Sequence, residues 1–307
     1  MSSTRIPLLL GAGLMGLPGS GARFTDVQEV QQWVNVMVQH GQPFIDCARA
    51  YGGGTAEKLI SQLDLKGVRV DTKIAPLAPG DFAPARVKEL AELSREALGP
   101  NIKIRVFYLH APDRSVPFED TLEAVNDLYK EGLFEELGLS NYMSWEVAEI
   151  VGICKRRGFV APTVYQGQYN VLYRTPEDEP NAPTHSGGLL TGKLLGAPPA
   201  PGSHFDPSSR VGALYTQRFA HAQAAAKLLR GFARRHDLAL IDVAYRWLQH
   251  HSAMGPEDHG MIVGGSSVAQ IEEAVVKCEQ GPLPDDLVAA CDKAWKAVRG
   301  HAPGYWQ

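Results

Sequence analysis

The sequence alternates between short apolar segments and longer segments with a helical hydrophobic period. In the segment 26–39, for example, valines at positions 27, 30, 34 and 38 recur at helical spacing. The expected strands are 6–10, 44–46, 68–73, 104–110, 137–140 and 163–166, and the expected helices are 26–39, 56–63, 84–98, 118–130 and 145–157. Because the strand segments are too apolar to keep one face in water, the alternation predicts a parallel sheet covered by helices.

The length of the chain selects among the folds that this alternation allows. With 307 residues, of which 44% are hydrophobic and 21% charged, the chain can bury a large core. Over about 300 residues, a parallel sheet covered by helices closes most economically as a (β/α)8 barrel. We therefore predict an α/β fold in which residues 1–307 form a single TIM barrel domain.

Composition excludes several classes of function. The longest apolar runs, such as 7–10, are far shorter than the ~20 residues of a transmembrane helix, and the N-terminus does not have the pattern of a secretory signal. The four cysteines are scattered singly, which fits a reducing compartment and indicates neither a metal site nor a disulfide framework. A net charge of −4 does not suit a general nucleic-acid partner. We expect a soluble, cytoplasmic protein with a small-molecule substrate, no membrane or nucleic-acid partner and no metal.

Polar residues occupy the C-terminal ends of successive predicted strands, the rim where barrel enzymes place their chemistry. These residues are Asp46, Lys73, His110, Ser140, Asn141 and Gln166. Tyr51 follows Asp46 in the next loop. The sequence therefore predicts an active site built from the loops at one end of the barrel.

The first predicted turn suggests an alternative fold to the barrel. Glycines at positions 11, 13 and 16 satisfy the G-x-G-x-x-G pattern of doubly wound dinucleotide-binding sheets. The acidic residue expected to hold a ribose does not follow in the usual way, because Asp46 comes 30 residues after Gly16 and leads into Tyr51. A lone glycine pattern is weak evidence, and the barrel is favoured.

Four of these residues suit hydride transfer to a carbonyl group. Such a reaction places negative charge on the carbonyl oxygen, which needs a proton and pre-placed hydrogen-bond donors. Tyr51 would give the proton, and Lys73 beside it would favour the tyrosinate and lower the phenol pKa from its free value near 10. Asp46 would hold the Lys73 ammonium, and His110 would donate to the carbonyl oxygen. A single buried tyrosine or histidine is more often an ordinary core residue, so the prediction rests on all four together.

The segment 44–52 reads Phe-Ile-Asp-Cys-Ala-Arg-Ala-Tyr-Gly, and further motifs occur at 71–73, 108–110, 138–142, 165–166, 187–193, 247–252 and 262–267. The first segment looks like the signature of the aldo-keto reductase family, and the other motifs follow in that family's order over nearly the whole chain. Within the family, the chain is most similar to the aflatoxin aldehyde reductase branch. The resemblance implies an NADP(H)-dependent oxidoreductase that reduces an aldehyde or ketone to the alcohol. It places the protein in secondary metabolism or aldehyde detoxification, with a homodimer as the expected assembly.

The resemblance also implies a cofactor site. Ser140, Asn141 and Gln166 match the positions that bind the nicotinamide carboxamide, and Asp46 is also a cofactor position. The remaining cofactor positions are Gly188, Leu189, Gly192, Lys193, Gly264, Ser266, Ser267 and Gln270. Small residues before a helix suit a phosphate, although Ser266 or Ser267 would equally serve as an ordinary N-cap. Arg218 matches an arginine that faces the substrate beside His110, but a lone arginine is as often a solvated surface residue.

The sequence departs from the family pattern in the seventh βα unit. Only sixteen residues, 171–186, occupy the space that should contain a helix and a strand, whereas a helix, a strand and two loops need at least about 20. The prolines at 176, 180 and 183 oppose both elements. We predict a truncated unit, so either the neighbouring strands close the gap or two sheet edges stay open.

Two smaller departures affect the cofactor positions. His204 stands where the family has an arginine, and Ala274 stands where it has an asparagine. An imidazole does not replace a permanently charged guanidinium. The alternative hypothesis is therefore a catalytically impaired relative that acts as a binding or regulatory subunit.

Overall fold

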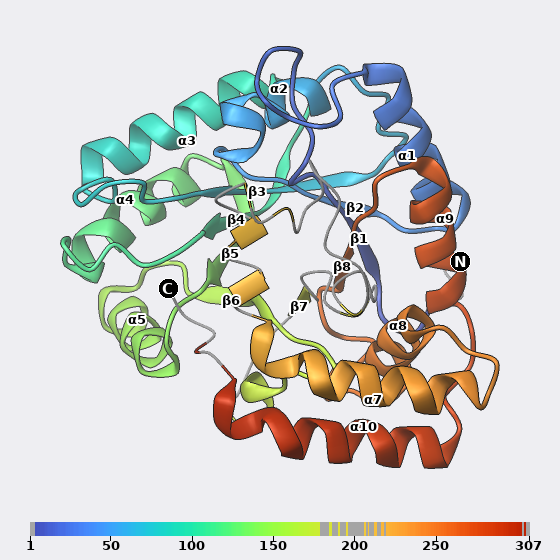
Figure 1. Cartoon of the computed structure of the whole chain (residues 1–307). Helices are drawn as coiled ribbons and strands as arrows, with labels where there is room; N and C mark the ends of the chain where they lie inside the picture. Colours follow the sequence, from blue (N-terminus) through green and yellow to red (C-terminus); the bar gives the residue numbers. More distant parts are fainter. Residues whose placement is uncertain are drawn as a thin grey trace.

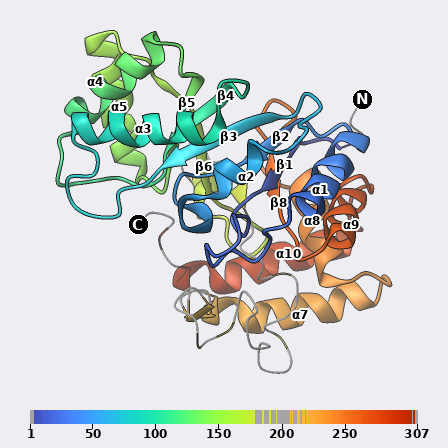
Figure 2. The ribbon, with the colours of Figure 1, turned by 90° about the horizontal axis from the view of Figure 1, so that it is seen from above.

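The computed structural model of the chain describes residues 4–178 and 219–302, together with 184–185, 190, 195, 206, 208, 212–213, 216–217 and 304. These residues form a barrel of parallel strands with helices around it (Figure 1). The view from above shows the same arrangement, with α1 and α9 on one side and α3, α4 and α5 on the other (Figure 2).

Eight strands pair in chain order, each parallel to its neighbours, and the last pairs with the first. The strands are β1 (Leu8–Gly11), β2 (Phe44–Asp46), β3 (Arg69–Ile74), β4 (Ile104–Leu109), β5 (Phe134–Ser140), β6 (Pro162–Gln168), β7 (Thr184–His185) and β8 (Met261–Val263). The barrel is closed, so the predicted (β/α)8 architecture is confirmed.

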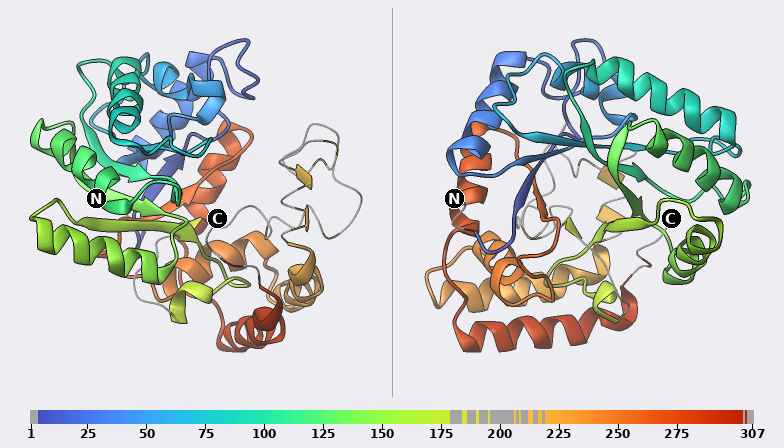
Figure 3. Two further views of the ribbon diagram at one scale, coloured as in Figure 1. Left: turned by 90° about the vertical axis from the view of Figure 1, so that its left-hand side faces the viewer. Right: turned by 180° about the vertical axis from the view of Figure 1, so that it is seen from behind.

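Helices cover the outside of the strands, as the side and back views show (Figure 3). They are α1 (Val27–Gln39), α2 (Ala56–Ile60), α3 (Pro84–Leu98), α4 (Phe118–Lys130), α5 (Ser144–Arg157), α7 (Gln223–Arg234), α8 (Leu240–His250), α9 (Val268–Cys278) and α10 (Asp285–Val298). In the view of Figure 1, α7 and α10 lie side by side along one edge of the barrel. None of the helices in the described part of the chain combines the length and hydrophobicity that crossing a bilayer requires.

Burial explains why the sequence alternates as it does. All six residues of β4 are buried, as a strand between the barrel interior and the helices must be. On α1, the buried Val30, Val34 and Met37 face inward at helical spacing. The helix begins after Asp26, whose carboxylate accepts a hydrogen bond from the Gln28 backbone N–H. The two hydrophobic periods therefore correspond to inner strands and half-buried helices.

The seventh unit is truncated, as predicted, but it leaves no open edge at β7. This strand is only two residues long, and Thr184 pairs with Gly167 of β6 on one side and with Met261 of β8 on the other. Of the residues described between β6 and β7, Thr175–Asp178 form a 3₁₀ helix, η2, and none belongs to an α-helix. The first of the two outcomes considered above is therefore the observed one: the barrel closes through β6, β7 and β8.

The connector after β6 packs onto the helices that follow it in the chain. Tyr169, Val171, Leu172 and Tyr173 are buried in the main core. Arg174 lies with its guanidinium carbon 4.2 Å from the ring centroid of Trp247 in α8, and its Nη1 donates a 2.8 Å hydrogen bond to Asp292 in α10. The connector therefore occupies buried space on α8 and α10.

Candidate active site

The predicted quartet lies at one rim of the barrel. Asp46 is the last residue of β2, and Tyr51 begins the short 3₁₀ helix η1 (Tyr51–Gly54). Lys73 is the last residue but one of β3, and His110 directly follows β4. Since the strands are parallel and adjacent, their C-terminal ends bring all four residues together, as the sequence predicted.

Lys73 is completely buried, and its ammonium has two close oxygen partners. Nζ lies 2.7 Å from Asp46 Oδ1 and donates a second 2.7 Å hydrogen bond to the backbone carbonyl of Cys47. Burial lowers the pKa of Lys73, but the charge of Asp46 and the nearby Tyr51 phenol raise it more, so the pKa lies above its ordinary value. The site therefore contains an ammonium that stays charged at neutral pH.

Asp46 links two of the predicted residues. Its Oδ1 accepts hydrogen bonds from Lys73 Nζ at 2.7 Å and from Gln166 Nε2 at 2.8 Å. All three side chains are buried, with Gln166 6% exposed. Because a buried charge without partners is costly, this arrangement keeps the ammonium and the carboxylate in one geometry.

Tyr51 is placed by the backbone around it. The Arg49 N–H donates to the carbonyl of Lys73 at 2.8 Å, which joins the loop after β2 to β3. Directly after Tyr51, Gly52 has a φ of 54° and lies so close to the β1–α1 loop that a Cβ would stand 2.3 Å from the Met15 carbonyl oxygen. Only glycine fits at this position. The close contact between the two loops therefore helps to fix the position of Tyr51.

The Tyr51 ring lies between the ammonium and the imidazole. Lys73 Nζ is 5.3 Å from the centroid of the Tyr51 ring. The rings of Tyr51 and His110 meet edge to face, with centroids 5.9 Å apart and an interplanar angle of 77°. A cation and an imidazole therefore lie close to one phenol, an arrangement that suits a tyrosine acting as a proton donor.

The residues predicted for the nicotinamide end lie beside the quartet. Ser140 ends β5 and is buried, and Asn141 follows it in the left-handed region with a φ of 62°. Asn141 Nδ2 donates to the His110 carbonyl at 2.8 Å and to Ser140 Oγ at 2.9 Å. This places hydroxyl and amide groups next to His110, a donor set that fits a carboxamide.

The segment 264–270, which we call the adenosine segment, connects β8 to α9. Ser267 caps α9, because its hydroxyl accepts a 3.3 Å hydrogen bond from the Gln270 N–H. Ser266 donates to Gln270 Oε1 through both its N–H and its hydroxyl, each at 2.9 Å. Among the described residues, none would contact a Cβ added at Gly264. An open glycine, two serines and the start of an eleven-residue helix fit a phosphate ester.

Several predicted positions lie outside the described residues. They are Gly188, Leu189, Gly192, Lys193, His204 and Arg218. Ala274, the remaining departure from the family pattern, lies on α9 and is buried in the core with 2% of its surface exposed.

Two buried carboxylates near the rim were not predicted from the sequence. Glu57 in α2 accepts hydrogen bonds from Arg49 at 2.6 Å and from Thr72 at 2.6 Å. These bonds tie the loop that carries Tyr51 to β3. Since Arg49 lies within the signature segment, a search for an acidic partner on the next helix could have found Glu57.

Asp113 connects the loops after β3 and β4. Its carboxylate accepts hydrogen bonds from the backbone N–H groups of Gly80 at 2.9 Å and Phe82 at 3.1 Å, and from Ser115. Burial raises the pKa of Asp113, but these hydrogen bonds outweigh it and lower the pKa below its ordinary value. The Asp-x-Ser turn that follows His110 was the available sequence signal.

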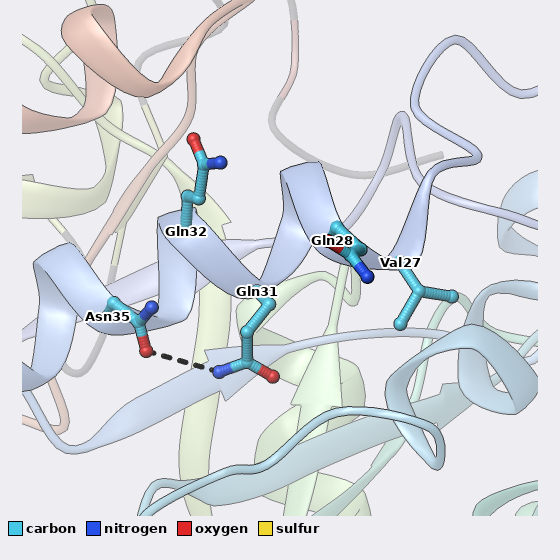
Figure 4. Close-up of a pocket in the computed structure, with 5 residues that line it drawn as sticks. All are labelled: Val27, Gln28, Gln31, Gln32 and Asn35. Carbon is cyan, nitrogen blue, oxygen red and sulfur yellow. Dashed lines mark hydrogen bonds between the residues drawn. The ribbon is translucent and has the colours of Figure 1, made fainter.

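A surface hollow lies on α1, away from the quartet. Figure 4 shows its lining, which consists of Val27 and four amide side chains, with Gln31 donating to Asn35 at 3.2 Å. It contains none of the predicted site residues. Among the described residues, no group of three or more His, Cys, Asp or Glu side chains is placed to hold a metal ion, and the four cysteines are free and buried.

Comparison with known proteins agrees with this geometry. Residues 9–296 match the aldo/keto reductase family. The chain belongs to this family. It is 38% identical to aldo-keto reductase pigE from Monascus ruber, over 99% of this chain and 98% of the relative. It is 34% identical to aflatoxin B1 aldehyde reductase member 2 from Mus musculus, over 96% of this chain and 88% of that protein. The chain is an oxidoreductase of this family, and the predicted similarity to the aflatoxin aldehyde reductases is confirmed.

PigE is longer than this aldo/keto reductase in the region compared. The comparison with pigE extends over 336 positions, more than the 307 residues of this chain. The relative therefore contains residues that have no counterpart here. Oxidoreductase sirO from Leptosphaeria maculans is 30% identical to the chain over 294 positions, which cover 91% of this chain and 89% of sirO.

Proposed function

We propose that this aldo/keto reductase uses NADP(H) to reduce an aldehyde or ketone to the alcohol, with Tyr51 as the proton donor. The observation that carries the proposal is the completely buried Lys73 ammonium, which lies 2.7 Å from Asp46 Oδ1 and 5.3 Å from the centre of the Tyr51 ring. A tyrosine is too weak an acid at neutral pH unless a fixed positive charge stabilises its anion.

The side chains have complementary roles in this reaction. Tyr51 transfers its proton to the carbonyl oxygen as negative charge develops there, and Lys73 stabilises the phenolate that remains. Asp46 and Gln166 hold the ammonium in place. His110, whose ring meets Tyr51 edge to face, donates a hydrogen bond to the carbonyl oxygen and orients the substrate.

NADP(H), when bound, supplies the hydride. Ser140, Asn141 and Gln166 would hold its carboxamide end. The adenosine segment, through Gly264, Ser266, Ser267 and Gln270, would hold its adenosine phosphate. Further cofactor contacts would come from Gly188, Leu189, Gly192 and Lys193, which lie outside the described residues. The open space at Gly264 and the exposed hydroxyl and amide groups support this assignment.

A reactive, bulky aldehyde is the substrate class that we propose. The mouse relative is named for an aflatoxin B1 aldehyde, and a shortened seventh unit leaves fewer residues on one side of the rim. Arg218 would bind an anionic group of the substrate. A homodimer, a cytoplasmic location and a role in secondary metabolism or aldehyde detoxification remain predictions.

The proposal is tested in two steps, by titrating NADPH through its fluorescence and by measuring turnover of 4-nitrobenzaldehyde. We expect saturable binding at micromolar NADPH, followed by aldehyde-dependent oxidation of the cofactor. NADH serves as the matched control for the 2′-phosphate contacts. If the protein does not bind NADPH at high micromolar concentration, the reductase proposal is wrong. If it binds NADPH but reduces no aldehyde or ketone, a role as a binding or regulatory subunit is favoured.

A further inference from the structure

Three residues lie side by side on the inner face of the barrel, directly below the rim. In the strand register, Lys73 of β3 is the partner of Tyr108 of β4, and Tyr108 is the partner of Gly138 of β5. Partner residues on adjacent strands point to the same face of a sheet. The row therefore places a buried tyrosine between the catalytic lysine and a residue without a side chain.

Gly138 makes room for the Tyr108 ring. A Cβ at this position would stand 2.2 Å from Tyr108 Cδ1 and 2.4 Å from Cε1. No such contact is possible, so any other residue would force the ring to move. Tyr108 also clusters with Val106 and Val164, and only 2% of its surface is exposed. The ring consequently has one well-packed position.

In this position the ring is close to the Lys73 ammonium. Nζ lies 5.6 Å from the centroid of the Tyr108 ring and 5.3 Å from that of the Tyr51 ring. Both distances fall within the range of a cation–π interaction, which is stronger where water is excluded. The ammonium is thus surrounded by a carboxylate, a carbonyl and two aromatic rings.

We propose that Tyr108 is a positioning residue for the Lys73 ammonium, and that Gly138 is required because it admits the Tyr108 ring. The inference rests on the proposed function, since it assigns Lys73 the task of stabilising the Tyr51 phenolate. Without the Tyr108 ring, the ammonium loses one attractive face and gains space to move away from Tyr51.

The ring, and not the hydroxyl, carries this role. Burial raises the pKa of Tyr108 well above 10, with the charges of Asp71 and Asp46 adding to the effect. Tyr108 therefore stays neutral and does not act as a second proton donor. Phenylalanine would keep the aromatic face, whereas leucine would keep only the apolar volume.

The experiment compares Tyr108→Phe and Tyr108→Leu with a matched control, Phe107→Leu. Phe107 directly precedes Tyr108 on β4 and points to the opposite face of the sheet. It is fully buried, and its ring stacks on that of Phe134 with centroids 5.3 Å apart. We expect Tyr108→Leu to lower kcat by about tenfold, in line with a buried cation–π contact, with KM and NADPH affinity nearly unchanged. Tyr108→Phe should keep most of the turnover. Phe107→Leu should lower the thermal midpoint but not kcat.

A second measurement does not depend on turnover. Alkaline titration by tyrosine absorbance is performed on the protein and on its Tyr51→Phe variant, and the difference isolates the ionisation of Tyr51. In the Tyr108→Leu background this step should move to higher pH by roughly one unit. Gly138→Ala, which displaces the ring, should shift it in the same direction.

These readouts separate the possible failures. An unshifted Tyr51 step and an unchanged kcat in Tyr108→Leu would overturn the inference, as would equal losses of kcat in Tyr108→Leu and Phe107→Leu. If the unmodified protein binds NADPH but reduces no carbonyl, the proposed reaction fails, while the shift of the Tyr51 step still decides the placement of Lys73.

Discussion

The quartet proposed for catalysis and the adenosine segment are built differently, although both lie on the same rim of the barrel. Within the quartet, the buried Asp46 and Lys73 are paired, and Asp46 Oδ1 accepts short hydrogen bonds from both Lys73 and Gln166, while Tyr51 and His110 beside them are partly exposed. In the adenosine segment, the partly exposed Ser266 and the exposed Gln270 bond to each other. The ion pair at the base of the quartet is therefore shielded from water, whereas the hydrogen bonds of the adenosine segment are open to it.

The difference indicates how each region meets its ligand. Buried groups that already have the required geometry do not need to reorganise during the reaction, which suits proton transfer and charge stabilisation. Surface hydrogen bonds exchange easily with a ligand, so Ser266 and Gln270 can turn toward a phosphate at small cost. We therefore expect substitutions in the quartet to have large effects, and substitutions in the adenosine segment to have small effects on cofactor affinity and on stability.

The largest expected effect comes from the proton donor. Tyr51→Phe removes the phenol oxygen but keeps the ring next to His110, so kcat should fall by roughly 10²- to 10⁴-fold while NADPH binding stays nearly unchanged. Steady-state kinetics and fluorescence titration measure the two effects. Tyr129→Phe, on the outer helix α4 and 41% exposed, is the matched control and should have normal kcat. Normal turnover in Tyr51→Phe would refute the acid assignment.

Breaking the buried ion pair should destabilise the fold. Lys73→Met leaves the Asp46 carboxylate buried without its cation, and Asp46→Asn leaves the ammonium without its anion. Each should lower the free energy of unfolding by about 3–5 kcal/mol. The double variant removes both charges and should recover most of this loss. Urea denaturation of the four proteins measures the coupling, and strictly additive losses would mean that the pair is not coupled as the geometry indicates.

Asp113 provides a smaller effect that depends on pH. Its pKa is lower in the folded protein than in the unfolded chain, so the unfolded state takes up the proton first as pH falls. The stabilisation is complete above the unfolded pKa near 3.9 and is lost as pH falls through the folded pKa. Asp113→Asn should therefore cost about 2 kcal/mol at neutral pH, and the difference from the unmodified protein should shrink below pH ~4. A difference that stays constant across this range would contradict the hydrogen-bond assignment.

The position of the quartet on the barrel rim could largely be predicted from the sequence, because local patterns determine it. Strand period, helix period and the polar residues at strand ends place the quartet on one rim once the sheet is parallel. The expected helix 26–39 corresponds to α1, and the strand expected at 137–140 proved to be the C-terminal part of β5. Helix α2, which ends at Ile60, is three residues shorter than expected.

Non-local packing could not be predicted in the same way. The truncation of the seventh unit followed from counting residues, but the pairing of Thr184 with both neighbouring strands depends on a register that no local pattern encodes. The contact of Tyr108 with Gly138 likewise depends on the alignment of β4 with β5. In the sequence, Gly138 is one glycine among 31, and Tyr108 is one residue of an apolar run.

The smallest expected effects lie in the adenosine segment. Gln270→Ala removes the partner of Ser266 and one contact proposed for NADPH, so the Kd for NADPH should rise by roughly three- to tenfold. Because Gln270 is exposed, the free energy of unfolding should change by less than about 0.5 kcal/mol. Ser267→Ala, in contrast, also removes the N-cap of α9 and should lower the free energy of unfolding by about 1 kcal/mol. Gln32→Ala, an exposed glutamine on α1, should change neither quantity. If Gln270→Ala destabilised the fold as much as Lys73→Met, the adenosine segment would be as rigidly built as the quartet, and the contrast between the two regions would not hold.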